Sequence, residues 1–501
     1  MPEALVLDST DNVAVAVRTL AAGETVVLGG RPDAHAHAVT LTEEIRPGHK
    51  FALEDIPTGG AVRKFSAPIG HATEDIATGA WIHSHNLSTN LGPDLAYEYR
   101  PKAGVREPGT STRTFQGYVR ATGDVGIRND LYLVPTVGCI NAMCQTIADQ
   151  FKRIHSGDNP FTSVIVTAHP YGCSQLGGDL EMTQRILRDI IRHPNAGGVL
   201  VIGLGCENNQ MELMKAGLGD YDTARVRFIV AQEAQDEIGD SLDLLDELAE
   251  AAKDDRREEV PLSKLRVGMK CGGSDGFSGI TANALIGRFA DYVADQGGSV
   301  VLTEVPEMFG AETFLMERTK DEKTFERLVD LINGFKDYFR RYGQPIYENP
   351  SPGNKEGGIT TLEEKSLGCI QKSGTTQVRD VLSYGERIHV PGVSLLEGPG
   401  NDLVSSSALA SAGCQLVLFS TGRGTPFGTY VPTVKISSNS DLANRKKRWI
   451  DFDAGRMLTE PAEDVLDDFI EEVLGVVNGV PTHNEEYGMQ EIAIFKDGVT
   501  E

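Results

Sequence analysis

The sequence predicts a mixed α/β protein of several domains, with a small all-β domain, a long linker and two α/β domains built on parallel, Rossmann-like sheets. Three observations predict this class. A chain of 501 residues is too long for one hydrophobic core. Short β-rich runs separated by glycine fill the first 90 residues, and apolar strands alternate with helical segments after residue 117. We therefore predict domains at 1–90, 117–260 and 261–501, with a linker at 91–116.

The first domain contains β-type runs near residues 12–17, 24–28, 37–41 and 62–65. Its last predicted strand carries His83-Ser84-His85-Asn86. Alternation along a strand would place His83 and His85 on one face, where they could bind a metal or a carboxylate. The alternative is two surface histidines at the end of a strand.

The segment after this domain is rich in turn-forming and charged residues and has no hydrophobic period, which is typical of a linker. Such a long connection implies that the β-domain is positioned by docking elsewhere. The β-domain could close over a site.

The middle domain alternates predicted strands at 131–135, 163–168, 199–203 and 226–230 with helices such as 141–154 and 179–192. The loops after three of these strands carry Cys139, Cys173 and Cys206. Ligands bind at the carboxyl ends of strands in such sheets, so these loops are notable. A dinucleotide site at Gly203-x-Gly205 is disfavoured because the third glycine is missing. The acidic segment 236–259 predicts a solvated helix before a domain boundary.

The C-terminal domain repeats the alternation, with strands at 265–269, 299–303, 393–396, 415–420 and, at the end of the sheet, 434–436. Helices are expected at 280–294, 323–342, 463–477 and from residue 402 to residue 412. Residues 348–358 predict a polar loop. Each strand feeds a Gly-rich polar loop, the arrangement expected when one rim of a sheet binds a ligand.

The segment from Lys270 to Asn283 is the strongest candidate for the reaction centre. It joins a strand to a helix through four glycines, so that backbone N–H groups can face an anion at the helix N-terminus. Cys271, Ser274 and Asp275 add polar groups. The alternative is a tight turn without function.

Carboxylates at two neighbouring strand ends predict a divalent metal site. Asp275 follows one strand, and Glu304 and Glu307 follow the next, so their oxygens could converge, with Cys271 as a further ligand. A metal there would bind a substrate carboxylate and stabilise the enediolate formed when the neighbouring proton is removed. The alternative is that these carboxylates cap helices.

Cations in the polar loops are candidates for catalysis: Lys355, Lys372 and Arg423 could neutralise a carboxylate or act as base. They are otherwise solvent-facing cations. The expected substrate-binding residues come from the same Gly-rich loops and are Ser274, Asn283, Asn354, Asn401 and Thr425.

Composition restricts the partners and the compartment. With 47 Lys+Arg against 72 Asp+Glu the net charge is −25, which argues against nucleic acid and anionic membranes as partners. Seven scattered cysteines form no disulfide framework, and Cys139 and Cys144 are only a weak metal pair. The first residues lack a basic segment followed by an apolar run, so we expect a cytoplasmic protein.

Several long loop strings resemble the altronate/galactarate dehydratase family, and the segments around 49–53 and 83–86 resemble its SAF (β-clip) domain. The strings are Gly172-Cys173-Ser174-Gln175-Leu176-Gly177, Gly203-Leu204-Gly205-Cys206-Glu207-Asn208-Asn209, Cys271-Gly272-Gly273-Ser274-Asp275, Thr303-Glu304-Val305-Pro306-Glu307, Asn349-Pro350-Ser351-Pro352-Gly353-Asn354-Lys355 and Ser420-Thr421-Gly422-Arg423-Gly424-Thr425-Pro426. The resemblance extends over essentially the whole chain.

This resemblance implies a hydro-lyase that converts the aldonate D-altronate to 2-dehydro-3-deoxy-D-gluconate in hexuronate catabolism. It implies a divalent metal, Fe2+ with Mn2+ as the alternative, a homodimer formed through the middle domain, and a metal site in the C-terminal domain. Galactarate or sulfolactate is the alternative substrate. Two other classes remain open from the residues alone: a nucleotide-binding oxidoreductase and a non-catalytic sugar-acid binding protein.

Overall fold

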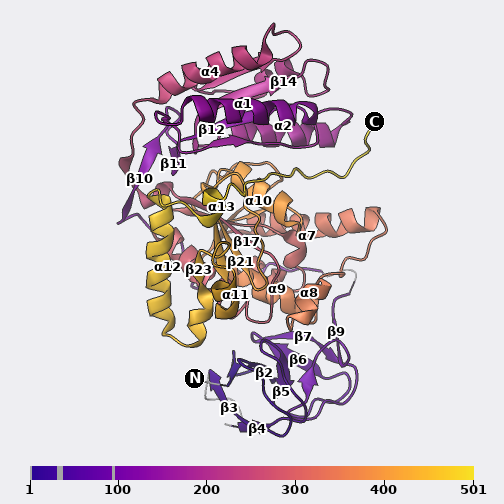
Figure 1. The fold of residues 1–501 in the computed structure, drawn as a ribbon. Helices are drawn as coiled ribbons and strands as arrows, with labels where there is room; N and C mark the ends of the chain where they lie inside the picture. Colours follow the sequence, from indigo (N-terminus) through magenta and orange to yellow (C-terminus); the bar gives the residue numbers. More distant parts are fainter. Residues whose placement is uncertain (1–2, 31–37, 93–95) are drawn as a thin grey trace.

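The computed structural model describes residues 3–30, 38–92 and 96–501. The start of the strand expected at 37–41 and residues 93–95 of the expected linker lie outside these ranges. Figure 1 shows three regions along the molecule: a strand-rich N-terminal region, a central region with helices around a sheet, and a second helix-covered sheet at the far end. The protein is thus a mixed α/β protein of several domains.

The N-terminal region consists of two small sheets with strand orders β4-β3-β1-β2-β5-β8 and β6-β7-β9. All pairs except β1 with β3 are antiparallel. The strands are β1 (Ala4–Val6), β2 (Val13–Ala16), β3 (Thr25–Gly30), β4 (Ala38–Thr40), β5 (Lys50–Ala52), β6 (Ala61–Lys64), β7 (Ala67–Ala72), β8 (Trp81–Ile82) and β9 (Leu87–Ser88).

The expected strand through His83 and His85 is wrong, because β8 ends at Ile82 and residues 83–86 form a turn. The Asn86 side chain closes this turn by accepting a hydrogen bond from the His83 backbone N–H at 2.9 Å. Local side-chain bonding of this kind competes with strand formation. The two histidines therefore do not share a strand face.

The expected linker runs along the C-terminal region. Lys102 N–H donates to the Glu317 carbonyl at 2.8 Å, and Gly109 N–H donates to that of Ala294 at 2.9 Å. Its end begins β10 in a small antiparallel sheet that joins the two larger regions. That sheet consists of β10 (Thr114–Val119), β11 (Val125–Gly126) and β16 (Glu258–Pro261).

The middle region of the sequence forms the sheet at the far end of the molecule in Figure 1, called the middle sheet below. It has four parallel strands in the order β13-β12-β14-β15. One core packs α1 and α4 against one face, while α2 and α3 cover the other. The elements are β12 (Asp130–Pro135), η1 (Gly138–Ile140), α1 (Asn141–Ile154), β13 (Val164–Val166), α2 (Gly178–Ile191), β14 (Ala196–Gly203), α3 (Met211–Ala216), β15 (Val226–Val230) and α4 (Glu237–Ala252). The sequence-based prediction of these strands and helices is confirmed.

The C-terminal sheet has seven parallel strands in the order β19-β20-β18-β17-β21-β22-β23, so that β17 is central. Its strands are β17 (Arg266–Cys271), β18 (Ser299–Leu302), β19 (Val378–Leu382), β20 (Gly392–Leu396), β21 (Leu416–Thr421), β22 (Thr433–Ser437) and β23 (Phe452–Asp453). The helices around it are α5 (Ala282–Asp295), α6 (Glu312–Met316), α7 (Glu322–Arg341), α8 (Pro352–Glu356), α9 (Leu362–Ile370), α10 (Asp402–Ser411), α11 (Ser440–Arg445), α12 (Ala462–Val477) and α13 (His483–Glu486). Short 3-10 turns are η2 (Leu262–Lys264), η3 (Val305–Glu307), η4 (Gln371–Ser373) and η5 (Ala454–Leu458).

Two expectations for this region are wrong, and two of its elements, β19 and α9, were not predicted. The sheet does not end at β22, because β23 pairs with it. The expected loop 348–358 contains α8, whose N-cap Ser351 forms a capping box with Asn354. Helix α9 was not predicted, because its charged residues Glu363, Glu364 and Lys365 are buried together with its apolar ones, so the sequence does not separate an apolar face from a solvent-facing one.

Candidate active site

A cavity of about 590 Å³ opens at the carboxyl end of the seven-stranded sheet. Loops after β17 and β20 line it together with η3, α8 and α9, so one rim of the sheet supplies most of its wall. The lining residues are Cys271, Gly272, Gly273, Glu307, Glu348, Asn349, Pro350, Ser351, Pro352, Asn354, Lys355, Lys365, Gly400, Asn401 and Asp402.

Lys270, the penultimate residue of β17, is a buried cation at the base of this rim. Its ammonium forms an ion pair with Glu304 and another, at 2.9 Å, with Asp402 at the start of α10. Burial lowers the pKa of Lys270, but the two carboxylates outweigh burial and hold it above its usual range. Lys270 therefore joins the end of β17 to the residues that follow β18 and β20.

Glu304 leaves β18 in the left-handed region, with φ at 70°. Both oxygens of its carboxylate are already bonded: one accepts from Lys270, and the other accepts from Lys372 at 3.2 Å and from Cys271 N–H at 3.1 Å. A non-glycine residue in this conformation costs about 1–3 kcal/mol and persists where its surroundings fix it. Glu304 thus organises the site rather than presenting a free oxygen to a metal.

Three buried side chains form a compact group of possible metal ligands: Cys271, Glu307 and Cys369. Their ligand atoms all lie within 4.8 Å of one another. The Glu307 carboxylate accepts from the Cys369 thiol at 2.9 Å and lies 3.2 Å from Cys271 Sγ, and the two sulfurs are 3.4 Å apart. Of these three, Cys271 and Glu307 also line the cavity.

Two further lysines surround this group. Lys365 donates to Ser274 Oγ at 2.9 Å and pairs with Glu307 at 3.3 Å, while Lys372 donates to Cys271 Sγ at 2.9 Å. Lys365 and Cys369 lie four residues apart on α9, so they share one helix face. The Lys365 ammonium lines the cavity, whereas Lys372 is fully buried behind it.

Lys365 and Lys372 lower the pKa values of Cys271 and Glu307. A hydrogen bond from Cys369 lowers the pKa of Cys271 to about 5, with Lys365 and Lys372 acting in the same direction against burial. Burial raises the pKa of Glu307, but the neighbouring lysines outweigh it and lower the value to about 2. At neutral pH the site therefore contains a thiolate and a carboxylate, as metal ligation requires.

These donors fit a divalent transition metal. Two sulfurs and one carboxylate oxygen suit Fe2+ or Zn2+ better than the hard ions Mg2+ and Mn2+. The three-residue group also leaves coordination positions toward the cavity, since two of its members face it.

The structure places the other expected metal ligand, Asp275, away from this group. Its carboxylate accepts hydrogen bonds from Ser278, Ser438 and Asn439 at 2.8–3.0 Å. Burial raises its pKa despite these donors. Asp275 holds the glycine loop in shape, a role that helix-capping carboxylates often have.

The expected substrate-binding residues divide into two sets. Asn354 and Asn401 line the cavity, and Ser274 lies next to it through its bond with Lys365. Asn283 is buried and bonds to the Gly368 carbonyl at 2.9 Å, and the Thr425 carbonyl accepts from Lys435 at 3.1 Å. Neither Asn283 nor Thr425 lines the cavity.

The expected catalytic cations and histidines also divide. Lys355 lines the cavity, while Arg423 is half exposed and pairs with Glu356 at 2.8 Å. His83 reaches the Lys355 carbonyl at 2.8 Å through Nε2, and His85 packs against Trp81 with ring centroids 5.1 Å apart. The histidines therefore lie behind α8 rather than in the cavity wall.

Sequence reasoning missed roles for Lys270, Lys365, Cys369 and Asp402. A lysine inside an otherwise apolar strand is a signal for Lys270, because a buried cation needs a partner. For Lys365 and Cys369 the available signal was the pattern Thr361-x-x-Glu364, which marks the start of helix α9.

The N-terminal region docks on the same helix. Lys50 and Lys64 both donate to the buried Glu364 carboxylate, at 2.8 and 2.9 Å. Gly48 lies so close to the glycine loop that a Cβ on Gly276 would come within 1.9 Å of its carbonyl oxygen. The N-terminal sheets thus hold α9 and the loop after β17 from outside.

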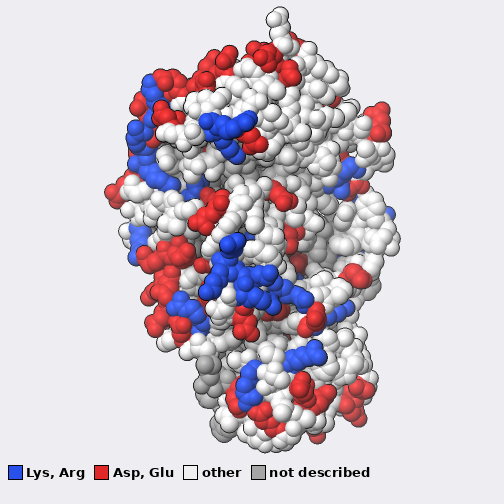
Figure 2. Space-filling view, viewed as in Figure 1, with Lys and Arg blue, Asp and Glu red and all other residues white. Residues whose placement is uncertain are grey.

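Basic residues gather in one patch on the surface of the C-terminal region. Figure 2 shows Lys and Arg side chains concentrated over α11 and its neighbours, while acidic residues spread over most of this face. The sequence carries Arg445, Lys446, Lys447 and Arg448 there. A local positive field on an acidic protein favours the approach of an anionic ligand.

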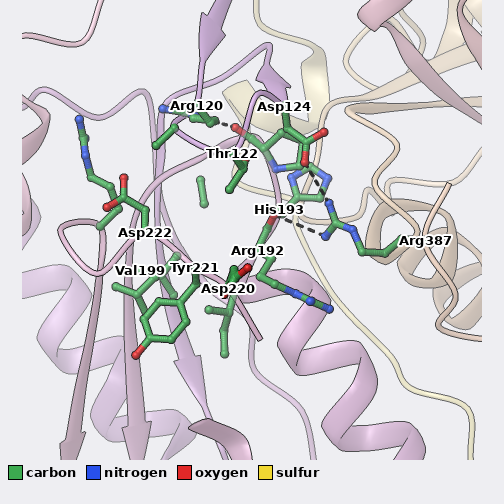
Figure 3. Close-up of a pocket in the computed structure, with 16 residues that line it drawn as sticks. Arg120, Thr122, Asp124, Arg192, His193, Val199, Asp220, Tyr221, Asp222 and Arg387 are labelled. Atoms are coloured by element: carbon green, nitrogen blue, oxygen red, sulfur yellow. Dashed lines mark hydrogen bonds and ion pairs between the residues drawn. The ribbon is translucent and has the colours of Figure 1, made fainter. Parts of the chain in front are cut away.

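A second cavity, of about 240 Å³, lies between the middle and C-terminal regions (Figure 3). Its arginines already have protein partners. Arg225 forms two bonds to Asp255 at 2.6 and 2.8 Å, Arg120 donates to the Pro194 carbonyl at 2.7 Å, and Arg387 pairs with Asp124 at 3.5 Å. This cavity has the features of a packed junction between regions.

The fold and the first cavity define an enzyme for a small anionic substrate. The chain matches three family descriptions: "Altronate/galactarate dehydratase SAF domain" over residues 2–90, "D-galactarate dehydratase/Altronate hydrolase, second domain" over 117–253, and "D-galactarate/Altronate dehydratase, C-terminal" over 262–500. The chain belongs to the altronate/galactarate dehydratase family, and its N-terminal region is the SAF domain of that family.

Individual relatives cover nearly the whole chain. It is 52% identical to the altronate dehydratase of Bacillus subtilis over 492 residues, 98% of each chain. It is also 52% identical to the altronate dehydratase of Escherichia coli over 495 residues, 99% of each chain. Identity to the galactarate dehydratase (L-threo-forming) of E. coli is 33% over 506 residues, 97% of this chain and 95% of that enzyme.

Among the described residues no helix is long and apolar enough to cross a membrane.

Proposed function

We propose that this chain is a hydro-lyase that dehydrates D-altronate to 2-dehydro-3-deoxy-D-gluconate and water, in hexuronate catabolism. The observation that carries the proposal is 52% identity to two altronate dehydratases over nearly the full length. The cavity supports it, because its buried lysines and thiol–carboxylate group suit a polyhydroxy carboxylate. Galactarate has less support, since the galactarate enzyme is 33% identical.

A divalent metal is part of the proposal: we favour Fe2+, since two sulfur ligands suit the sequence-based alternative Mn2+ less well. Cys271, Glu307 and Cys369 would hold it. When bound, such an ion polarises the substrate carboxylate and so makes the neighbouring C–H bond more acidic. This set replaces the sequence-based set of Asp275, Glu304, Glu307 and Cys271.

The chain's own residues bind and orient the substrate. Lys355 at the cavity wall neutralises the carboxylate end, and the amides of Asn354 and Asn401 bond to hydroxyl groups. Asn354 is fixed for this role because its Nδ2 already donates to the Ser274 carbonyl at 2.8 Å. Bonds from rigid groups of this kind orient the reacting bonds without loss of freedom at the moment of reaction.

Lys365 holds the proton that the departing hydroxyl needs. Burial lowers the pKa of Lys365, but the surrounding Cys271, Cys369 and Glu307 outweigh burial and keep its ammonium protonated. Its Nζ faces the cavity beside Ser274. Donation from Nζ would convert the leaving hydroxyl into water.

The finer organisation is likewise proposed: Rossmann-like topology for both parallel sheets, domains at 117–260 and 261–501, and a homodimer formed through the middle domain. A cytoplasmic location stays a prediction.

The test is turnover of altronate, galactarate and sulfolactate by the purified chain incubated with Fe2+ under reducing conditions. We expect kcat/KM to be highest for altronate, with 2-dehydro-3-deoxy-D-gluconate as product. Faster turnover of galactarate, or none with any of the three, would refute the proposal. A nicotinamide-dependent absorbance change would instead support the oxidoreductase class.

A further inference from the structure

Three thiols of the middle region stand at the ends of three adjacent parallel strands. Cys139 follows β12, Cys173 follows β13 and Cys206 follows β14, in a sheet whose order is β13-β12-β14. Each cysteine comes directly after a glycine. The carboxyl ends of neighbouring strands meet at one edge of the sheet, so the three loops that carry these thiols lie side by side.

Backbone hydrogen bonds tie these loops together. Gly138 N–H donates to the Tyr171 carbonyl at 2.8 Å, which joins the first loop to the second. Asn209 N–H donates to the Gly172 carbonyl at 2.9 Å, and its side chain donates to the Thr136 carbonyl at 2.9 Å. The third loop is thus bonded to both of the others, and the cysteines are held in one small region.

Glycine makes this close approach possible. Gly172 has φ at 101°, and a Cβ there would lie 2.1 Å from the Thr136 carbonyl oxygen. Ser174, on the other side of Cys173, also adopts a positive φ of 56° and donates its N–H to Asn208 Oδ1 at 2.8 Å. The backbone on both sides of Cys173 is therefore fixed in conformations that L-residues adopt at a cost.

The thiols themselves are exposed. Cys139, Cys173 and Cys206 are free and exposed, whereas Cys144 and Cys414 are buried in apolar surroundings. Packing explains the buried pair, but it does not explain three exposed thiols on bonded loops. The nearest carboxylate in the loops, Glu207, is used internally, since it accepts from Leu204 N–H, Gly205 N–H and Thr136 Oγ1.

The sulfur atoms of Cys139, Cys173 and Cys206 do not all lie close enough together to be ligands of one ion. In the described part of the chain, three candidate ligand atoms come within 4.8 Å of one another only at Cys271, Glu307 and Cys369. An iron–sulfur cluster binds each thiolate at a different iron, so its ligands lie farther apart than those of one ion. Three cysteines on three loops also leave one iron of a four-iron cluster without a protein thiolate.

We propose that Cys139, Cys173 and Cys206 ligate a [4Fe–4S] cluster at the carboxyl edge of the middle sheet, with one iron open to an oxygen ligand. On binding, each thiol releases its proton and binds one iron as a thiolate. The backbones of Thr500 and Glu501 lie along this site, since Gln175 pairs with Thr500 and Glu501 N–H donates to the Ser174 carbonyl at 2.9 Å. The proposal is independent of altronate dehydration.

The test is anaerobic reconstitution of the full chain with ferrous iron and sulfide, followed by iron and sulfide analysis, visible absorption and EPR of the reduced protein. We expect about four irons and four sulfides per chain in a cluster, in addition to any single ion at the other site. The variant C139S/C173S/C206S should lose the cluster signals while its circular dichroism and melting temperature stay unchanged, because all three side chains are exposed.

Two matched variants locate the signal. C144S changes a thiol of the same region, and C271S/C369S removes the thiols of the active-site cavity; both should retain the cluster. Absence of a cluster in the wild-type chain, a cluster that survives in C139S/C173S/C206S, or its loss in C271S/C369S alone would overturn the proposal. Iron bound without sulfide would overturn it as well.

Discussion

The two parallel sheets of this protein end in loops of opposite character. At the seven-stranded sheet the rim is buried and charged, with Lys270, Lys365 and Lys372 packed among carboxylates and two thiols. At the four-stranded sheet the rim is exposed, and its three thiols have no ammonium among their hydrogen-bond or ion-pair partners in the described residues. The same architecture thus carries two kinds of site, and the loops alone decide which.

Removal of metal should have the largest effect. A strong chelator is expected to abolish altronate turnover, and added Fe2+ to restore it, because the rim of the seven-stranded sheet offers a group of three metal ligands.

Glu307→Gln should raise the Fe2+ concentration for half-activation at least ~10-fold, since it removes one ligand. The control is Glu348→Gln, which lines the same cavity outside the ligand group. Equal Fe2+ requirements in both variants would contradict the ligand assignment.

Lys365→Met should lower kcat by roughly 10²–10⁴, the range lost with a general acid. The control Lys323→Met removes an exposed lysine from α7 and should leave kcat unchanged. Because Glu307 loses a partner in the first variant, its melting temperature is measured alongside kcat. A kcat within a factor of ten of wild type would remove Lys365 from the mechanism.

Glu364→Gln tests how the SAF domain supports the charged rim. It leaves Lys50 and Lys64 buried without a carboxylate, so the free energy of unfolding should fall by about 3–5 kcal/mol. The exposed Glu356→Gln is the matched control. Adding Lys50→Met to the first variant should restore part of the stability; a loss below ~1 kcal/mol would show that the network is not needed for docking.

The Glu364 carboxylate also predicts that the free energy of unfolding depends on pH. Burial raises the pKa of Glu364, but Lys50 and Lys64 outweigh it and hold the pKa far below its ordinary value of 4.5. The stabilisation by Glu364 is therefore complete above pH 4.5 and is lost as the pH falls from there toward the folded-state pKa. Chemical denaturation should give a stability difference between wild type and Glu364→Gln that narrows below pH 4.5. A difference that stays constant down to acid pH would contradict it.

Arg423→Ala should have the smallest effect on stability. Its ion pair with Glu356 is exposed, and such pairs contribute about 0–1 kcal/mol. The midpoint of denaturation should hardly move. Any rise in KM for altronate without a change in kcat would assign Arg423 to substrate capture.

Regular periodicity predicted most of the fold. The four strands of the middle sheet and the five inner strands of the C-terminal sheet follow from apolar runs alternating with amphipathic segments, and α1 begins and ends where the pattern does. The two edge strands β19 and β23 were not predicted. Helix α9 was missed, because its charged residues are buried and no solvent-facing side marks it; the pattern Thr361-x-x-Glu364 was the one local signal of its start. The His83 turn was missed because Asn86 closes it with a side-chain bond that no strand pattern records.

The candidate site was predicted only in part, from the loops that follow the predicted strands. Strand-end loops identified Cys271, Glu307 and Asn354 as neighbours of one cavity. The Asp275 carboxylate accepts hydrogen bonds from Ser278, three residues on, and from the distant Asn439, while Glu304 pairs with Lys270 and Lys372. Which carboxylate is free for a metal depends on partners distant in sequence, and only the folded chain brings those together.

Iron anomalous scattering from crystals of the iron-loaded protein with altronate tests the central claim most directly. We predict a peak between the sulfurs of Cys271 and Cys369 and the carboxylate of Glu307, with altronate beside Lys365. A cluster peak at Cys139, Cys173 and Cys206 would be separate from it. Altronate bound in the cavity with no iron between Cys271, Glu307 and Cys369 would contradict the claim.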